Sequence, residues 1–99
     1  MNTYPFESQF GDKYNLSVSM RKHPNGQTRI DLIDSEDGSP YATATVSVPD
    51  QFFEEDEVFV KNYSENIGVL TFLVTNNIVH PPHRAFGSGY VNIPVCRLK

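Results

Sequence analysis

Apolar residues recur at every second position through the first third of the chain, a spacing that is typical of β-strands with one buried face. The alternating apolar positions are Tyr4, Phe6, Phe10, Leu16, Val18, Met20, Ile30 and Leu32. Gly11-Asp12 interrupts the pattern once, and Pro24-Asn25-Gly26 interrupts it again with the residues of a type I turn followed by a residue of positive φ. We therefore predict three successive strands that are joined by tight turns.

Residues 41–48 show the clearest alternation, with alanine and valine at the even positions and tyrosine, threonine and serine at the odd ones. This pattern predicts a fourth strand in an antiparallel sheet that is covered on one face only. Residues 58–60 predict a short fifth strand, and residues 91–95 predict a final one. Pro94 within the final strand indicates a position at the edge of the sheet.

Between these last two strands the apolar period changes to that of a helix. Asn62 or Ser64 can cap the helix, and Glu65 stands three residues after Asn62, in the spacing of a capping box. We expect the helix at about residues 64–77, because the proline pair at residues 81–82 cannot continue it.

The order β-β-β-β-β-α-β predicts an α+β fold, an antiparallel sheet of about five to six strands with one helix packed on one face. A small open barrel that is plugged by the helix is the alternative, because it has the same pattern. A chain of 99 residues is long enough for one core, so we expect a single domain over residues 1–99.

The charge is distributed unevenly. Nine of the twelve acidic residues lie between Asp31 and Glu57 without an intervening Lys or Arg, whereas the rest of the chain has eight bases and three acids. The molecule is therefore expected to be electrically two-sided. Acidic runs are usually solvated loops that favour solubility, and a docking surface for a basic partner is the functional alternative. The acidic residues of this candidate surface are Asp50, Glu54, Glu55, Asp56 and Glu57.

The predicted helix carries a second candidate surface. Val69 and Phe72 lie opposite its main apolar stripe, and Glu65 is the only charged residue of the Asp, Glu, Lys or Arg types between residues 62 and 83. Either the end of the chain covers this face, or Val69 and Phe72 form a patch that docks a partner or a second copy of the chain, a homodimer.

Residues able to bind metal or to catalyse a reaction are few. His80, His83 and Cys96 are three metal-ligand types, but they lack the paired, tight spacing of a zinc site, so we expect no metal and no cofactor. Cys96 alternates with valine near the chain end, which favours a buried apolar role over that of a nucleophile. We expect no enzymatic activity, and an enzyme with an unrecognised site is a lesser alternative.

The composition also bears on partners and location. The pI of about 5.2 and the segment of residues 31–57, which has nine acids and no Lys or Arg, disfavour contact with phosphates. We therefore expect no direct nucleic-acid binding, and a small nucleic-acid-associated regulator is the first alternative function. The first residues lack the pattern of a secretion signal, and no apolar run is long enough to span a bilayer. With a single cysteine, these features predict a cytoplasmic protein without membrane contact.

Three segments, residues 37–46, 57–66 and 88–96, contain the sequences DGSPYATATV, EVFVKNYSEN and SGYVNIPVC. Together they resemble a family of small uncharacterised bacterial proteins carried on mobile elements. The resemblance implies no catalytic residue. It implies a plasmid, phage or integrative-element context, in which small acidic proteins include inhibitors of defence nucleases. We therefore expect a non-catalytic protein-binding module, such as an anti-CRISPR-like inhibitor, that docks through its acidic surface on a basic partner.

Overall fold

The structure, a computed structural model, describes residues 2–49 and 51–99 of the chain. The strands within these residues are β1 (Tyr4–Glu7), β2 (Lys13–Lys22), β3 (Thr28–Asp34), β4 (Pro40–Thr43), β5 (Glu57–Phe59), β6 (Arg84–Ser88) and β7 (Val91–Arg97). A short 3-10 helix, η1 (Ser64–Asn66), precedes the α-helix α1 (Val69–Thr75). None of the helices in the described part of the chain is long and apolar enough to cross a membrane.

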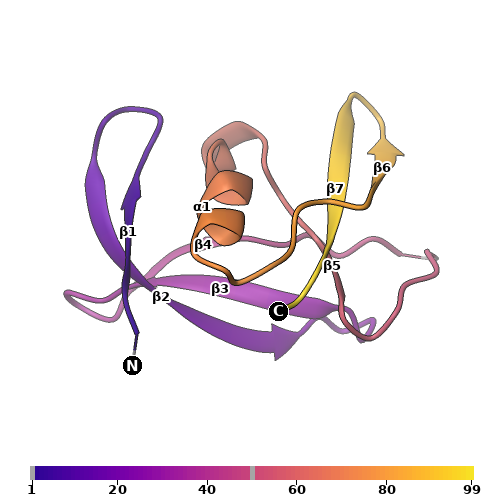
Figure 1. Ribbon diagram of the computed structural model, residues 1–99, viewed down its shortest axis with the longest axis horizontal. Coiled ribbons are helices and arrows are strands. Elements are labelled where there is room, and N and C mark those ends of the chain that lie inside the picture. The colour runs from indigo at the N-terminus through magenta and orange to yellow at the C-terminus, as the bar shows by residue number, and fades with distance from the viewer. Residues whose placement is uncertain (1, 50) are drawn as a thin grey trace.

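The strands form two antiparallel sheets, one with the order β1-β2-β3-β4 and one with the order β5-β7-β6 (Figure 1). The predicted α+β class, with antiparallel strands and one α-helix, is confirmed. The prediction of one sheet with five to six strands is wrong, because the strands of the described residues divide into two sheets. The sheets meet just beyond β4 and β5, where Thr45 and Val60 form an isolated bridge and the amides of Val46 and Lys61 donate to the carbonyls of Phe59 and Ala44. Across the described residues, the strands do not close into a barrel.

The turn between β2 and β3 matches the sequence prediction. Gly26 has a φ of 88°, its amide donates to the His23 carbonyl at 2.9 Å, and the His23 amide donates to the Gln27 carbonyl at 2.8 Å. A glycine suits this position because it adopts positive φ without steric cost. The turn aligns Lys22 with Thr28 and sets the register of the whole β2–β3 ladder.

The fourth strand is shorter than residues 41–48. The Ala44 amide still donates to the Ile30 carbonyl of β3 at 2.8 Å, but the Val46 amide donates to the Phe59 carbonyl of β5 at 2.9 Å. The side chain of Gln27, which is buried, replaces the missing strand partner. Its Nε2 donates to the Val48 carbonyl at 2.8 Å, and its Oε1 accepts from the Val48 amide at 2.8 Å. A polar side chain thus satisfies buried backbone groups where the ladder has ended.

The helical segment is divided by Gly68, which has a φ of 96° and separates η1 from α1. A residue with positive φ cannot continue a right-handed helix, so the predicted helix of residues 64–77 shortens to seven residues in α1. Asn62 still contributes to the helix start, since its Oδ1 accepts from the Leu70 amide at 3.0 Å. The N-cap residue of α1 is Gly68, so the prediction that Asn62 or Ser64 caps the helix in a capping box with Glu65 is wrong.

The main core lies between the first sheet, α1 and the inner side of β5 and β7, and Figure 1 shows α1 between the two sets of strands. Its fully buried side chains are Leu16, Ile30, Leu32, Ala44, Val58, Val60, Val69, Leu73, Val79 and Cys96. A smaller cluster covers the other side of β5 and β7, with Phe59, Ile93 and Val95 at its centre. Neighbouring residues of β5 therefore enter different clusters, as the alternation of side chains along a strand requires.

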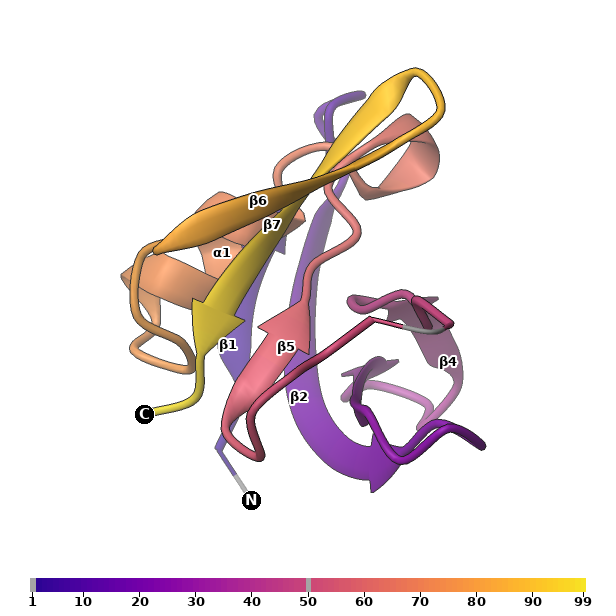
Figure 2. The same ribbon diagram turned by 90° about the vertical axis from the view of Figure 1, so that its right-hand side faces the viewer.

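The last two strands form a hairpin that projects from the molecule, as Figure 2 shows. The apolar pattern does not predict β6. The prediction from Pro94 of a sheet edge is wrong, because β7 is the central strand of its sheet. The structure accommodates Pro94 because β5 has ended opposite it. The Val60 amide donates to the Pro94 carbonyl at 2.9 Å, and proline has no amide hydrogen to return a bond.

Candidate functional site

The acidic residues 54–57 form a turn that leads into β5, and Glu57 lies at its buried end. The Glu57 amide donates to the Glu54 carbonyl at 3.0 Å, and the Glu54 amide donates to Glu57 Oε1 at 2.8 Å. Only 2% of Glu57 is exposed to solvent. The prediction that Glu57 belongs to an acidic surface is wrong, because its side chain is buried.

Two residues around the start of β6 surround the Glu57 carboxylate. Arg84 donates from Nε to Oε2 and from Nη2 to Oε1, each at 3.1 Å, and His83 Nε2 lies 2.6 Å from Oε2. The Arg84 hydrogen bonds are the main cause that lowers the pKa of Glu57 to about 2, against the opposing effect of burial. Glu57 is therefore ionised and fully engaged within the fold at neutral pH.

The other acids of the turn remain at the surface. Arg97 Nη1 donates to Asp56 Oδ1 at 2.8 Å, and Arg97 Nη2 donates to Glu54 Oε1 at 3.2 Å. Glu55 is exposed and makes no ion pair with a described residue. Asp50, the fifth residue of the predicted acidic surface, lies outside the described residues. We call residues 54–56 the acidic wall.

An open groove separates the acidic wall from the end of β2. Its lining residues are Met20, Arg21, Lys22, Thr28, Glu54, Glu55, Asp56 and Leu98. Lys22 Nζ donates to Thr28 Oγ1 at 3.2 Å. Arg21 and Lys22, which lie outside the acidic residues 31–57 of the sequence, are therefore across the groove from the acidic wall. The expectation of an electrically two-sided molecule is wrong at this groove. Strand pairing brings these charges together, and no spacing in the sequence indicates their proximity.

Acids at the β3–β4 turn form a separate surface. Asp34 Oδ1 accepts from the Glu36 amide at 2.9 Å, and Asp37 Oδ1 accepts from the Ser39 amide at 2.9 Å and from the Ser39 hydroxyl at 2.6 Å. The two hydrogen bonds from Ser39 lower the pKa of Asp37. Among the described residues, no ion pair joins Asp34, Glu36 or Asp37 to a base. The carboxylates of Asp34 and Asp37 stabilise the turn between β3 and β4. Because the three acids lie away from the groove, they are a control for the acidic wall.

The second predicted surface, at Val69 and Phe72, is absent because both side chains lie in the core. Val69 is 0% exposed and Phe72 is 5% exposed. Strand β1 covers this side of α1: the Phe72 ring meets the Tyr4 and Phe6 rings edge to face, with centroids 6.2 Å and 5.4 Å apart. The prediction of a docking patch is wrong here, and the covering element is the first strand rather than the end of the chain.

The three candidate metal ligands are separated by the fold. Cys96 is buried in the core, which raises the pKa of its thiol to about 11, whereas His83 contacts Glu57 and His80 is exposed. Within residues 2–49 and 51–99, no three His, Cys, Asp or Glu side chains gather in a group that could hold a metal ion. A thiol with a raised pKa is mostly protonated and is a poor nucleophile.

Comparison of the chain with protein-family models, curated proteins and solved structures gave no match. The resemblance to mobile-element proteins stays a prediction. The charge pattern of the sequence predicts Glu54, Glu55 and Asp56 as surface acids, but it does not indicate which bases lie beside them. Arg97 reaches Glu54 and Asp56 through the pairing of β7 with β5, and Lys22 lines the groove from the end of β2.

Proposed function

We propose that the protein is a non-catalytic protein-binding module that presents the acidic wall to a basic surface of a partner protein. The observation that carries this proposal is the position of the wall beside an open groove, with Glu55 exposed and without an ion-pair partner among the described residues. A basic side chain that enters the groove gains a carboxylate partner without displacing Arg97. Opposed charges of this kind mainly accelerate the encounter of two proteins.

The groups that could otherwise support catalysis have structural roles, which supports a binding function. The Glu57 carboxylate is held by Arg84 and His83, and the Cys96 thiol is enclosed by apolar side chains. A general base must reach the proton that it removes, and a nucleophile must reach the substrate. The class of partner rests on the resemblance to mobile-element proteins alone, which implies a nuclease of a bacterial defence system. Absence of nucleic-acid binding, the cytoplasmic location and homodimer formation stay predictions.

Association kinetics with a partner identified from the native host tests the proposal. The variant Glu54→Gln, Glu55→Gln, Asp56→Asn removes the three charges of the acidic wall. We expect its association rate to fall at least about tenfold at low salt. The wild-type rate should decrease as salt is added, because dissolved ions screen the electrostatic attraction between the two proteins. Thermal stability is expected to change little, because exposed ion pairs such as those of Arg97 contribute about 0–1 kcal/mol.

The matched control removes the same number of charges elsewhere. Asp34→Asn, Glu36→Gln, Asp37→Asn changes the net charge equally at the β3–β4 turn. If the wall docks the partner, this control keeps most of the wild-type association rate. Equal slowing in both variants shows that net charge alone acts, and an unchanged rate in the wall variant shows that the wall does not dock.

A further inference from the structure

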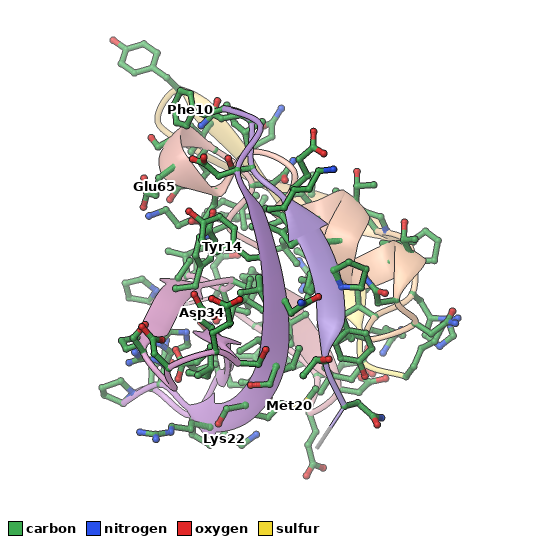
Figure 3. All side chains as sticks on the ribbon, turned by 90° about the vertical axis from the view of Figure 1, so that its left-hand side faces the viewer. Phe10, Tyr14, Met20, Lys22, Asp34 and Glu65 are labelled. Atoms are coloured by element: carbon green, nitrogen blue, oxygen red, sulfur yellow. The ribbon has the colours of Figure 1, made fainter. Side chains whose placement is uncertain are left out.

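Strand β2 is longer than its neighbour β1, and in the described part of the chain this leaves part of the β2 edge without a partner strand. The β1–β2 pairing starts at Tyr4, which lies opposite Leu16, whereas β2 continues to Lys22. Figure 3 shows the end of β2 that carries Met20 and Lys22 curving away from β1. Among the described residues, residues 18–22 thus pair with β3 on one side only. We call residues 18–22 the open edge.

The direction of the backbone groups in the open edge follows from the hydrogen bonds at both ends of the β2–β3 ladder. The His23 amide donates to Gln27, and the Ser35 amide donates to Asn15, so the odd-numbered residues of β2 direct their backbone groups toward β3. The even-numbered residues Val18, Met20 and Lys22 then direct theirs away from β3. Among the described residues, no hydrogen bond reaches the amides of Val18, Met20 or Lys22 from that side.

The open edge borders the groove. Met20 is 51% exposed although it is apolar, and Met20 and Lys22 line the groove together with Leu98 and the acidic wall. An extended segment placed beside β2 would pair its backbone with Met20 and Lys22. Every second side chain of that segment would face the groove. One such side chain would meet Met20 and Leu98, and another would lie toward the wall, across the groove from the bases Arg21 and Lys22.

We propose that the open edge binds an extended, basic segment of a partner protein by strand addition. Backbone hydrogen bonds to Met20 and Lys22 supply the pairing, an apolar side chain covers Met20, and a Lys or Arg side chain meets Glu55. Free strand edges are common sites for such peptides, with main-chain bonds giving affinity and side-chain pockets giving selectivity. This inference rests on the proposed function, because it names the form in which the basic partner reaches the acidic wall.

A capped peptide of alternating valine and lysine is a suitable probe for nuclear magnetic resonance titration of the full chain. We expect saturable shifts at Val18, Met20 and Lys22, and a several-fold slowing of hydrogen exchange at the Met20 and Lys22 amides. A peptide of alternating valine and glutamate should bind at least about tenfold more weakly, because it opposes the wall. Equal binding of both peptides, or no binding of the lysine peptide, would overturn the proposal.

The backbone bonds are tested by Met20→Pro, which removes one amide hydrogen that faces away from β3. Proline is tolerated at strand edges whose amide points to solvent, so the β2–β3 ladder is retained. Met20→Thr is the matched control, because it removes the same apolar side chain and keeps the amide. We expect peptide binding to be lost in Met20→Pro and retained, though weaker, in Met20→Thr.

A peptide that is N-methylated at alternate residues gives the same answer without changing the protein, in case the proline variant does not fold. Its binding should be lost, since the methyl groups block strand pairing. Binding that survives both N-methylation and Met20→Pro overturns strand addition. If that surviving binding is nonetheless lost in Glu54→Gln, Glu55→Gln, Asp56→Asn, the acidic wall still docks a basic partner and only the open edge is excluded.

Discussion

Glu57 and Arg84 are joined by two parallel hydrogen bonds of 3.1 Å, although they stand on different strands and 27 positions apart in the chain. The pair links β5 to β6, which do not neighbour each other in the sheet because β7 lies between them. The carboxylate is buried and the guanidinium is partly exposed. The most acidic segment of the chain is thus anchored to the last hairpin by its least exposed acid.

Removing this carboxylate should destabilise the fold. We expect Glu57→Gln to lower the free energy of unfolding by about 2 kcal/mol at pH 7, because Arg84 and the Glu54 amide lose a charged acceptor in a partly buried place. Urea denaturation followed by circular dichroism measures the change. Glu55→Gln is the control, and its effect should stay within about 0.5 kcal/mol. Equal losses in both variants would contradict the structural role of Glu57.

The same pair predicts a pH dependence. The pKa of Glu57 is lowered from 4.5 in the unfolded chain to about 2 in the fold. A lowered pKa means that the stabilisation is complete above about pH 4.5 and is lost as the pH falls toward 2. Denaturation measured between pH 7 and pH 2.5 should show a steeper loss in the wild type than in Glu57→Gln. Parallel curves would show that other acids cause the loss.

Phe72 should behave as a core residue and not as a docking residue. Phe72→Ala is expected to lower the free energy of unfolding by about 3–5 kcal/mol, because it leaves a cavity against Tyr4 and Phe6. Thr71→Ala, at the exposed neighbouring position, should change it by less than about 0.5 kcal/mol. Thermal unfolding compares the two. A stable Phe72→Ala protein would mean that β1 does not cover the helix.

Gln27 should be required for stability although it is polar. Gln27→Met keeps the length of the side chain but leaves the buried amide and carbonyl of Val48 without partners, at a cost of about 2 kcal/mol or more. Gln9→Met is the matched control, since the bond from Gln9 to the Ser64 carbonyl is exposed. Chemical denaturation of both variants measures the difference. If Gln27→Met left the free energy of unfolding unchanged, residues 44–48 would hold their position without the two hydrogen bonds from Gln27 to Val48.

Cys96 should be unreactive in the folded protein. Its thiol is enclosed in the core and its pKa is raised to about 11, so about one molecule in a thousand carries the thiolate at pH 8. We expect a chromogenic disulfide reagent to leave Cys96 unmodified in buffer and to modify it fully in denaturant. Rapid labelling of the native protein would mean that β7 opens readily or that the thiol is exposed.

The sequence alone determined most of the elements whose side chains alternate between core and solvent, although the alternating residues 44–48 do not continue β4. Strands β1 to β3 and the Gly26 turn could be predicted because one buried face gives each strand a period of two, and because positive φ favours glycine. Strand β6 could not be predicted. Most of its residues are exposed and it includes Gly87, so nothing but its pairing with β7 makes it a strand.

The candidate site depended on tertiary structure in a different way. Charge composition identified residues 54–57, but whether each acid is buried, paired or free depends on which base the sheets bring beside it. Arg84 encloses Glu57, Arg97 pairs with Asp56, and Glu55 remains exposed. Likewise, the open edge of β2 results from the different lengths of two paired strands. Local patterns specify which residues seek burial, and only the packed fold decides which backbone and charged groups remain without partners.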